Sequence, residues 1–208
     1  MIDQATLLTY LAVLTGFVFI PGPAVLMTLA RATSSGTRVG MATGLGIAGG
    51  DLVHTAMAVF GLSAVLAASA TLFNLIKYLG AAYLVYLGIR AIVARTDSGL
   101  LARTPPITAR KAFRQAVLAE MLNPKSALFF LAFLPQFVQP RNGAVPAQLA
   151  ALGILFVVMG AVSTMLFAIA AGRIGKFLRR NPGVVRWQGK VVGAIYCALG
   201  VRLALQER

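Results

Sequence analysis

The sequence predicts an all-α integral membrane protein with six transmembrane helices, built as two inverted three-helix repeats with the first helix of each half broken at proline. Three observations support this prediction: the composition, the length of the apolar segments and a pair of matching proline motifs. Of the 208 residues, 59% are hydrophobic and only 12% are charged. A soluble domain is about half apolar and about a quarter charged, so this chain has too few charges to cover a surface facing water.

The apolar residues form six long segments, and about 20 consecutive apolar residues are enough to cross a bilayer. Helix is the expected structure because an open strand leaves its backbone groups unpaired in lipid. A closed barrel needs alternating segments of about 10 residues, which the sequence does not show. The six segments are residues 6–31, 43–68, 76–93, 112–137, 146–171 and 188–205.

The first half of the chain holds three of these segments. A cleavable signal peptide has Lys or Arg before its apolar run. The first segment has neither, so we expect it to remain as the first helix. Glycines at Gly36, Gly40 and Gly44 lead into the second segment, and their four-residue spacing predicts one smooth face for close helix packing. The third segment contains K-Y-L-G-A-A-Y at residues 77–83.

The second half repeats this plan. Its last segment contains K-V-V-G-A-I-Y at residues 190–196, which matches the motif of the third segment, together with Cys197, the single cysteine. Because each half has an odd number of spans, a duplicate must lie inverted relative to its partner, as in many secondary transporters. We therefore expect repeats at residues 1–95 and 112–208, joined by a cytoplasmic linker at residues 96–111 to form one membrane domain.

The net charge of +14 follows the loops. Fourteen of the nineteen Lys and Arg residues fall at the first, third and fifth loops, which share one side of the membrane. The positive-inside rule places that side in the cytoplasm, so both termini are predicted outside a bacterial inner membrane. We interpret the charge as a topology signal and expect no nucleic-acid partner.

Both halves interrupt their first helix in the same way. A proline removes one N–H group and disfavours helix in the residue before it, and freed backbone groups at membrane depth are tolerated only against protein or a water-filled cavity. Matching interruptions in the two halves point to a central substrate site. The candidate substrate-binding residues at the breaks are Pro21, Gly22, Pro23, Asn123, Pro124 and Lys125.

Two carboxylates lie inside the segments, at Asp51 and Glu120. An ionisable residue at that depth is costly and marks a functional site, so Asp51 is a candidate for substrate binding and both acids for proton coupling. His54 lies three residues after Asp51 on the same helix face, where it either relays a proton or makes a hydrogen bond within the bundle. With no cysteine near it, His54 makes a poor transition-metal site, and we expect neither a metal nor a cofactor.

Three ordered motifs resemble the LysE/RhtB amino-acid exporters. They are F-x-P-G-P at residues 19–23, the glycine run that ends at Gly50-Asp51, and N-P-K-x-x-x-F-F-x-x-F-x-P-Q-F at residues 123–137. The likeness extends to Gly80, Tyr83 and Gly88 of the third segment, and Asn-Pro-Lys is closer to the threonine/homoserine branch. The resemblance implies a bacterial inner-membrane exporter of amino acids or their derivatives, driven by an ion gradient and homodimeric.

We therefore expect a secondary transporter, and not an enzyme, that exports small amino acids by alternating access and is coupled to protons. The absence of G-x-x-x-x-G-K-[ST] from the sequence argues against self-contained ATP coupling. Two alternatives remain open at this point. One is a metal-ion exporter on the same scaffold, and the other is a membrane enzyme that uses Asp51 and Glu120 as an acid/base pair.

Overall fold

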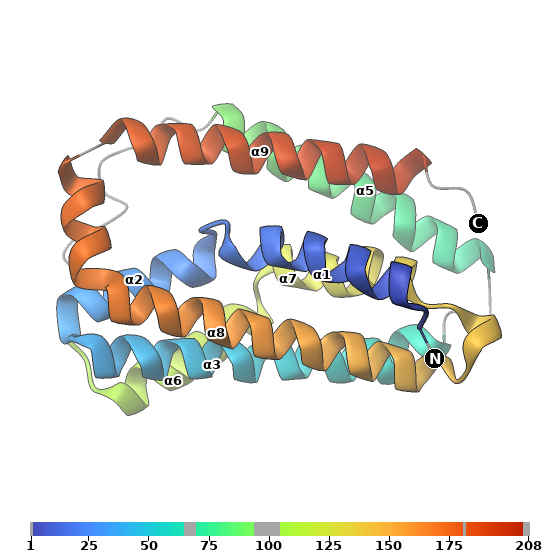
Figure 1. The fold of residues 1–208 in the computed structure, drawn as a ribbon, viewed down its shortest axis with the longest axis horizontal. Helices are drawn as coiled ribbons and strands as arrows, with labels where there is room; N and C mark the ends of the chain where they lie inside the picture. Colours follow the sequence, from blue (N-terminus) through green and yellow to red (C-terminus); the bar gives the residue numbers. More distant parts are fainter. Residues whose placement is uncertain (1, 65–69, 94–104, 181, 206–208) are drawn as a thin grey trace.

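The structure is a computed structural model that describes residues 2–64, 70–93, 105–180 and 182–205, and every regular element in these ranges is helical (Figure 1). Residues 94–104, most of the predicted linker, lie outside the described residues. The helices are α1 Gln4–Phe19, α2 Pro23–Ser35, α3 Thr37–Met57, η1 Ala58–Leu62, α5 Ala70–Val93, α6 Ala109–Met121, α7 Pro124–Leu128, η3 Phe129–Phe133, η4 Leu134–Phe137, η5 Pro140–Asn142, α8 Val145–Arg180 and α9 Pro182–Leu205.

The described residues contain three to five candidate membrane spans, judged by length and composition. Three helices are long and apolar enough by themselves, namely Thr37–Leu62, Asn74–Val93 and Val145–Ile174, and two bent pairs qualify if each pair counts as one span. An all-helical membrane protein is confirmed. The sixth predicted segment, residues 188–205, is helical within α9, and the count of six spans stays a prediction.

The two bent pairs are the two helices that the proline motifs predict to be broken. α1 meets α2 at 44°, and α6 meets the helical stretch Pro124–Phe137 also at 44°. Pro23 and Pro124 each stand at the start of the helix that follows the break. A proline costs nothing there, because its missing N–H would have had no partner within the helix.

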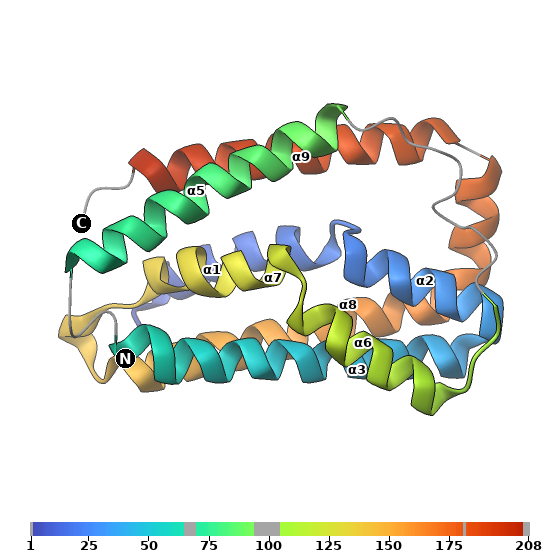
Figure 2. The same ribbon diagram turned by 180° about the vertical axis from the view of Figure 1, so that it is seen from behind.

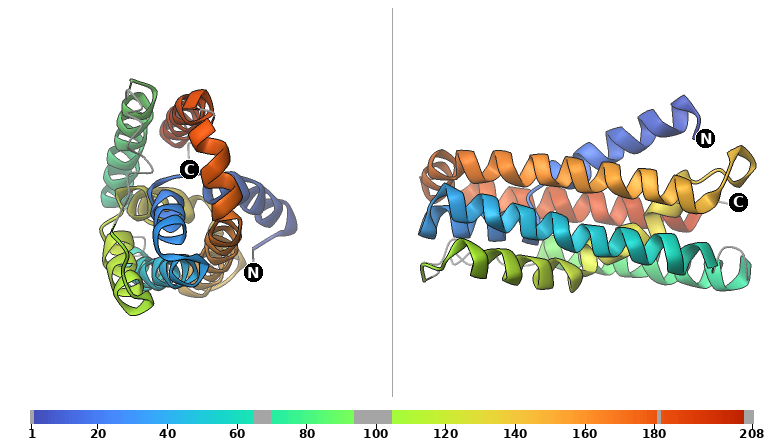
Figure 3. Two further views of the ribbon diagram at one scale, coloured as in Figure 1. Left: turned by 90° about the vertical axis from the view of Figure 1, so that its left-hand side faces the viewer. Right: turned by 90° about the horizontal axis from the view of Figure 1, so that it is seen from below.

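The helices form a bundle with one separate pair. α3 packs against α2, α6 and α8, while α5 packs along α9 on the other side of the broken helices (Figures 1 and 2). Seen from the end, α2 lies among α3, α6 and α8 (Figure 3). The residues around the two breaks are buried, among them Val18, Glu120 and Asn123, so the free backbone groups there can find partners within the protein.

Glycine permits the close contacts of α3, although not at every predicted position. A Cβ at Gly40 would lie 2.5 Å from the Ala32 Cβ, and one at Gly44 would lie 2.8 Å from the Thr164 hydroxyl. Gly36 differs: it has φ +90° and separates α2 from α3, with nothing within 4 Å of an added Cβ. The predicted packing role of Gly36 is therefore wrong, because this glycine serves a turn that needs the left-handed region.

An aromatic core lies between α1, η3 and α8. Phe129 packs against Phe17 and Phe156 with ring centroids 4.5 and 4.8 Å apart, and the Tyr10 hydroxyl donates to the Leu152 carbonyl at 2.7 Å. At the end of the bundle, Asp3 caps α1 and accepts a hydrogen bond from Gln139. Hydrogen bonds from the Thr6 backbone and from Gln139 lower the pKa of Asp3 to about 2.

The start of α1 and the end of α9 lie at the same end of the bundle (Figure 1). The α2–α3 turn, the start of α6, the end of α8 and the start of α9 lie at the opposite end. The placement of both termini on the outer side of a membrane stays a prediction.

Candidate functional site

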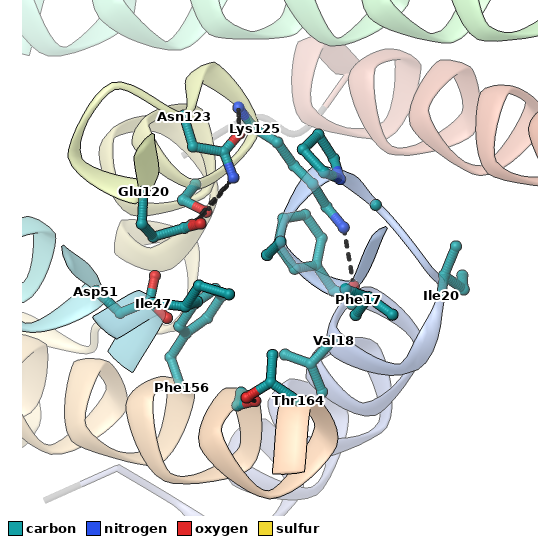
Figure 4. Close-up of a pocket in the computed structure, with 16 residues that line it drawn as sticks. Phe17, Val18, Ile20, Ile47, Asp51, Glu120, Asn123, Lys125, Phe156 and Thr164 are labelled. Carbon is teal, nitrogen blue, oxygen red and sulfur yellow. Dashed lines mark hydrogen bonds between the residues drawn. The ribbon is translucent and has the colours of Figure 1, made fainter. Parts of the chain in front are cut away.

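The two helix breaks meet at one small cavity (Figure 4). Its volume of about 40 Å³ has room for no more than about three water molecules. Six helices contribute to its wall: α1, α2, α3, α6, α7 and α8. Among the lining residues are Phe17, Gly22, Pro23, Asp51, Glu120, Asn123, Lys125, Ser126, Phe156 and Thr164.

The first break frees backbone carbonyls at the end of α1. In an unbroken helix the Phe17 carbonyl would pair with the N–H of Pro21, but proline has none. The Lys125 ammonium group replaces that donor from across the cavity, with Nζ 3.1 Å from the Phe17 oxygen. The next carbonyl, that of Val18, accepts a hydrogen bond from the Ser163 hydroxyl of α8 at 2.7 Å.

The second break is satisfied in the same manner. Pro124 removes the donor that would pair with the Glu120 carbonyl. That carbonyl instead forms hydrogen bonds with His54 Nε2 of α3, at 2.9 Å, and with the Asn123 backbone N–H, at 2.9 Å. Because a carbonyl can only accept, His54 carries its proton on Nε2. The ring also stacks on Phe130, with centroids 5.6 Å apart.

The Glu120 side chain is fixed by two donors from the residues after the break. Its Oε1 accepts hydrogen bonds from Asn123 Nδ2, at 3.0 Å, and from the Ser126 hydroxyl. Asn123 also caps the following helix, since its Oδ1 accepts from the Lys125 backbone N–H at 3.0 Å. Asn123 therefore links the carboxylate to the new helix start, and Ser126 is a site residue that the sequence analysis missed.

Asp51 faces Glu120 and is only 2% exposed. Its Oδ1 is buried and accepts no hydrogen bond from the described residues. Its carboxyl group interacts electrostatically with both Glu120 and Lys125. An unsatisfied buried polar atom costs about 1–3 kcal/mol. Asp51 therefore has bonding capacity that a donor entering the cavity can use.

Lys125 forms the opposite wall of the cavity (Figure 4). It is 8% exposed, and its Nζ lies 4.1 Å from the centroid of the Phe17 ring. A Cβ at Gly22 would lie 3.1 Å from Nζ, a tight contact that would displace the end of the lysine side chain by a few tenths of an ångström. Gly22 also starts α2 without a side-chain cap. The ammonium group and the positive end of the α2 dipole thus adjoin each other.

The structure brings together six of the nine predicted site residues. Gly22, Pro23, Asp51, Glu120, Asn123 and Lys125 line the cavity. Pro21, Pro124 and His54 are not among the lining residues; the two prolines create the free carbonyls, and His54 supplies a donor to one of them. Among the described residues, no three His, Cys, Asp or Glu side chains are grouped as a metal site.

The fold and the cavity together define a helical membrane protein with a polar site between two broken helices. The chain matches the LysE type translocator family over residues 15–207 and belongs to that family, as its motifs predict.

Relatives cover almost the whole chain. An uncharacterized membrane protein of Vibrio cholerae is 32% identical, over 95% of each chain. The homoserine/homoserine lactone efflux protein of Salmonella typhimurium is 29% identical, over 94% of each chain. The leucine efflux protein of Salmonella choleraesuis is 27% identical, over 98% of each chain. No solved structure matches the chain at a significant level.

Proposed function

We propose that this translocator exports small amino acids or close derivatives from the cytoplasm across the bacterial inner membrane, coupled to the proton gradient. The separation of charge across the cavity is the observation that carries this proposal. Asp51 and Glu120 lie on one side, while Lys125 and the start of α2 lie on the other (Figure 4). Two relatives with efflux names, for homoserine/homoserine lactone and for leucine, support the direction and the substrate class.

A zwitterionic amino acid carries the complementary pair of charges. Its carboxylate binds Lys125 and the free N–H groups of the first turn of α2, since a helix N-terminus favours an anion. Its ammonium group binds Asp51, whose Oδ1 has no partner among the described residues. The cavity of about 40 Å³ is too small for an amino acid, so binding requires the broken helices to move apart.

Alternating access between two inverted repeats provides that movement. The two helix breaks support the repeat, because a free carbonyl at each break is bonded by the second predicted segment of the other half. Ser163 of α8 donates to the Val18 carbonyl of α1, and His54 of α3 donates to the Glu120 carbonyl of α6. The contacts of α5 with α9 are reciprocal as well. A Cβ at Gly88 would lie 2.6 Å from the Gly193 oxygen, and one at Gly200 would lie 2.8 Å from the Ala81 oxygen.

The proton is carried by the acid pair. Asp51 and Glu120 lie close together and buried at one cavity, and acidic side chains inside a membrane protein mark proton pathways. A proton from outside neutralises one carboxylate of the pair, which weakens the hold on the substrate ammonium, and discharge of that proton inside restores the substrate site. His54 is linked to the pair by its hydrogen bond with the Glu120 backbone carbonyl. The transporter acts as a homodimer, as its family resemblance implies.

Export from loaded vesicles tests the proposal. Purified protein in vesicles, with a proton gradient imposed inward, should move a labelled amino acid out against its own concentration gradient. A protonophore should stop that movement while leaving downhill exchange intact. Uphill efflux that continues after the gradient collapses would exclude proton coupling. Resistance of a sensitive strain to toxic metals, and not to toxic amino acids, would favour a metal-ion exporter instead.

The predicted topology has its own test. Reporter fusions with opposite compartment preferences at Arg208 and near Ser98 should place the C-terminus outside and the 96–111 linker in the cytoplasm, because the basic loops stay inside. A fusion at Gly143, between the fourth and fifth predicted segments, should report the outside as a control. A cytoplasmic C-terminus would mean that one predicted segment does not cross.

A further inference from the structure

A second cavity touches Lys125 from the side away from the acids. It has a volume of about 200 Å³ and lies between α1 and α9. We call it the α1/α9 chamber. Apart from Lys125 and the Tyr196 hydroxyl, its lining side chains are apolar, and Gly16 contributes only backbone. They belong to Ala12, Val13, Gly16, Phe17, Ile20, Lys125, Ile195, Tyr196 and Leu199.

We propose that the α1/α9 chamber receives an aliphatic side chain of the exported amino acid, so that the substrates include residues as large as leucine. This inference rests on the proposed function. It adds a subsite to the charged cavity and assigns Gly16 as a residue that sets the permitted side-chain size.

The connection between the two cavities supports this assignment. Phe17, Ile20 and Lys125 line both of them, so a molecule bound at Lys125 adjoins the charged cavity and the chamber together. An amino acid has three substituents on its Cα that can use these regions. With the carboxylate at Lys125 and the ammonium group toward Asp51, the side chain is left to enter the chamber.

The size and chemistry of the chamber select the side chain. An apolar cavity of about 150 Å³ is known to hold benzene, which has six carbons. The four carbons of a leucine side chain therefore fit within about 200 Å³. A cationic side chain would lose its hydration among these apolar groups and would face the Lys125 ammonium group, so it would gain no partner of opposite charge.

Gly16 offers a way to fill the chamber without disturbing its walls. A Cβ added at Gly16 would meet nothing within 4 Å, and the residue lies inside α1 in helical conformation. Gly61 provides a matched control, because it is also helical, also has nothing within 4 Å of an added Cβ, and is not a lining residue of the chamber. Gly16→Leu and Gly61→Leu thus add the same apolar volume at two positions.

The experiment is counterflow of labelled alanine, valine and leucine in vesicles that contain the purified full chain. The wild type should exchange all three. Gly16→Leu should lower leucine exchange at least about tenfold and leave alanine within about twofold, as expected when methylenes compete for an apolar pocket. Gly61→Leu should match the wild type for all three amino acids.

The outcomes separate the two proposals. A wild type that exchanges none of these amino acids and no homoserine would contradict the proposed function itself. A wild type that exchanges alanine but not leucine would overturn only the chamber assignment. Equal losses of alanine and leucine in Gly16→Leu, or no loss of either, would also overturn it, since the added side chain would then not compete with the substrate's side chain.

Discussion

Replacing Asp51 by asparagine should leave the protein in the membrane in normal amount and abolish export against a gradient. The amide keeps the size and much of the hydrogen-bonding capacity, but it cannot ionise and binds an ammonium group less strongly than a carboxylate does. Losing a charge-assisted hydrogen bond of about 1.5–3 kcal/mol lowers affinity about 10- to 150-fold. Uphill efflux and downhill exchange, measured in the same vesicles, check this expectation.

Glu120→Gln is the matched comparison for this substitution. The Glu120 Oε1 atom is held by Asn123 and Ser126, and an amide oxygen can accept the same two hydrogen bonds. We therefore expect weaker coupling with a smaller loss of substrate exchange. Concentrative export at the wild-type rate by a stable Asp51→Asn protein would remove Asp51 from the mechanism and leave Glu120 as the proton carrier.

Replacing Lys125 by glutamine should remove the preference for a substrate carboxylate. The glutamine amide can still donate to the Phe17 carbonyl that Pro21 leaves without a partner, but it carries no positive charge. The preference of the wild type for an amino acid over its amide should fall about 10- to 150-fold in the variant, the equivalent of one charge-assisted hydrogen bond. Competition of the two compounds against labelled substrate measures that preference.

Ser163→Ala is the control for the structural part of this effect. Ser163 bonds the Val18 carbonyl at the same break, yet it carries no charge. Its loss should destabilise the folded protein by about 1 kcal/mol, as for other hydrogen bonds between membrane helices, and should preserve the carboxylate preference. If Ser163→Ala loses that preference as fully as Lys125→Gln, the preference depends on the shape of the break and not on the lysine charge.

Much of the architecture could be predicted from the sequence because its causes are local. Composition alone determines that the chain belongs in a membrane, and a missing N–H at Pro21 or Pro124 interrupts a helix whatever surrounds it. The buried acids Asp51 and Glu120 were predictable for a similar reason, since an ionisable residue inside an apolar segment is costly unless it has a use. Gly36 was misassigned because a glycine in a turn and one in a helix contact look alike in sequence.

The partners of the broken helices were decided only by the tertiary structure. Lys125 reaches the Phe17 carbonyl across 108 residues of chain, and Ser163 reaches Val18 across 145. His54 had two open interpretations, and the fold places its Nε2 on the Glu120 carbonyl. Proline determines locally that a carbonyl is freed, whereas the donor that satisfies it is whichever side chain the packing of distant helices brings within about 3 Å.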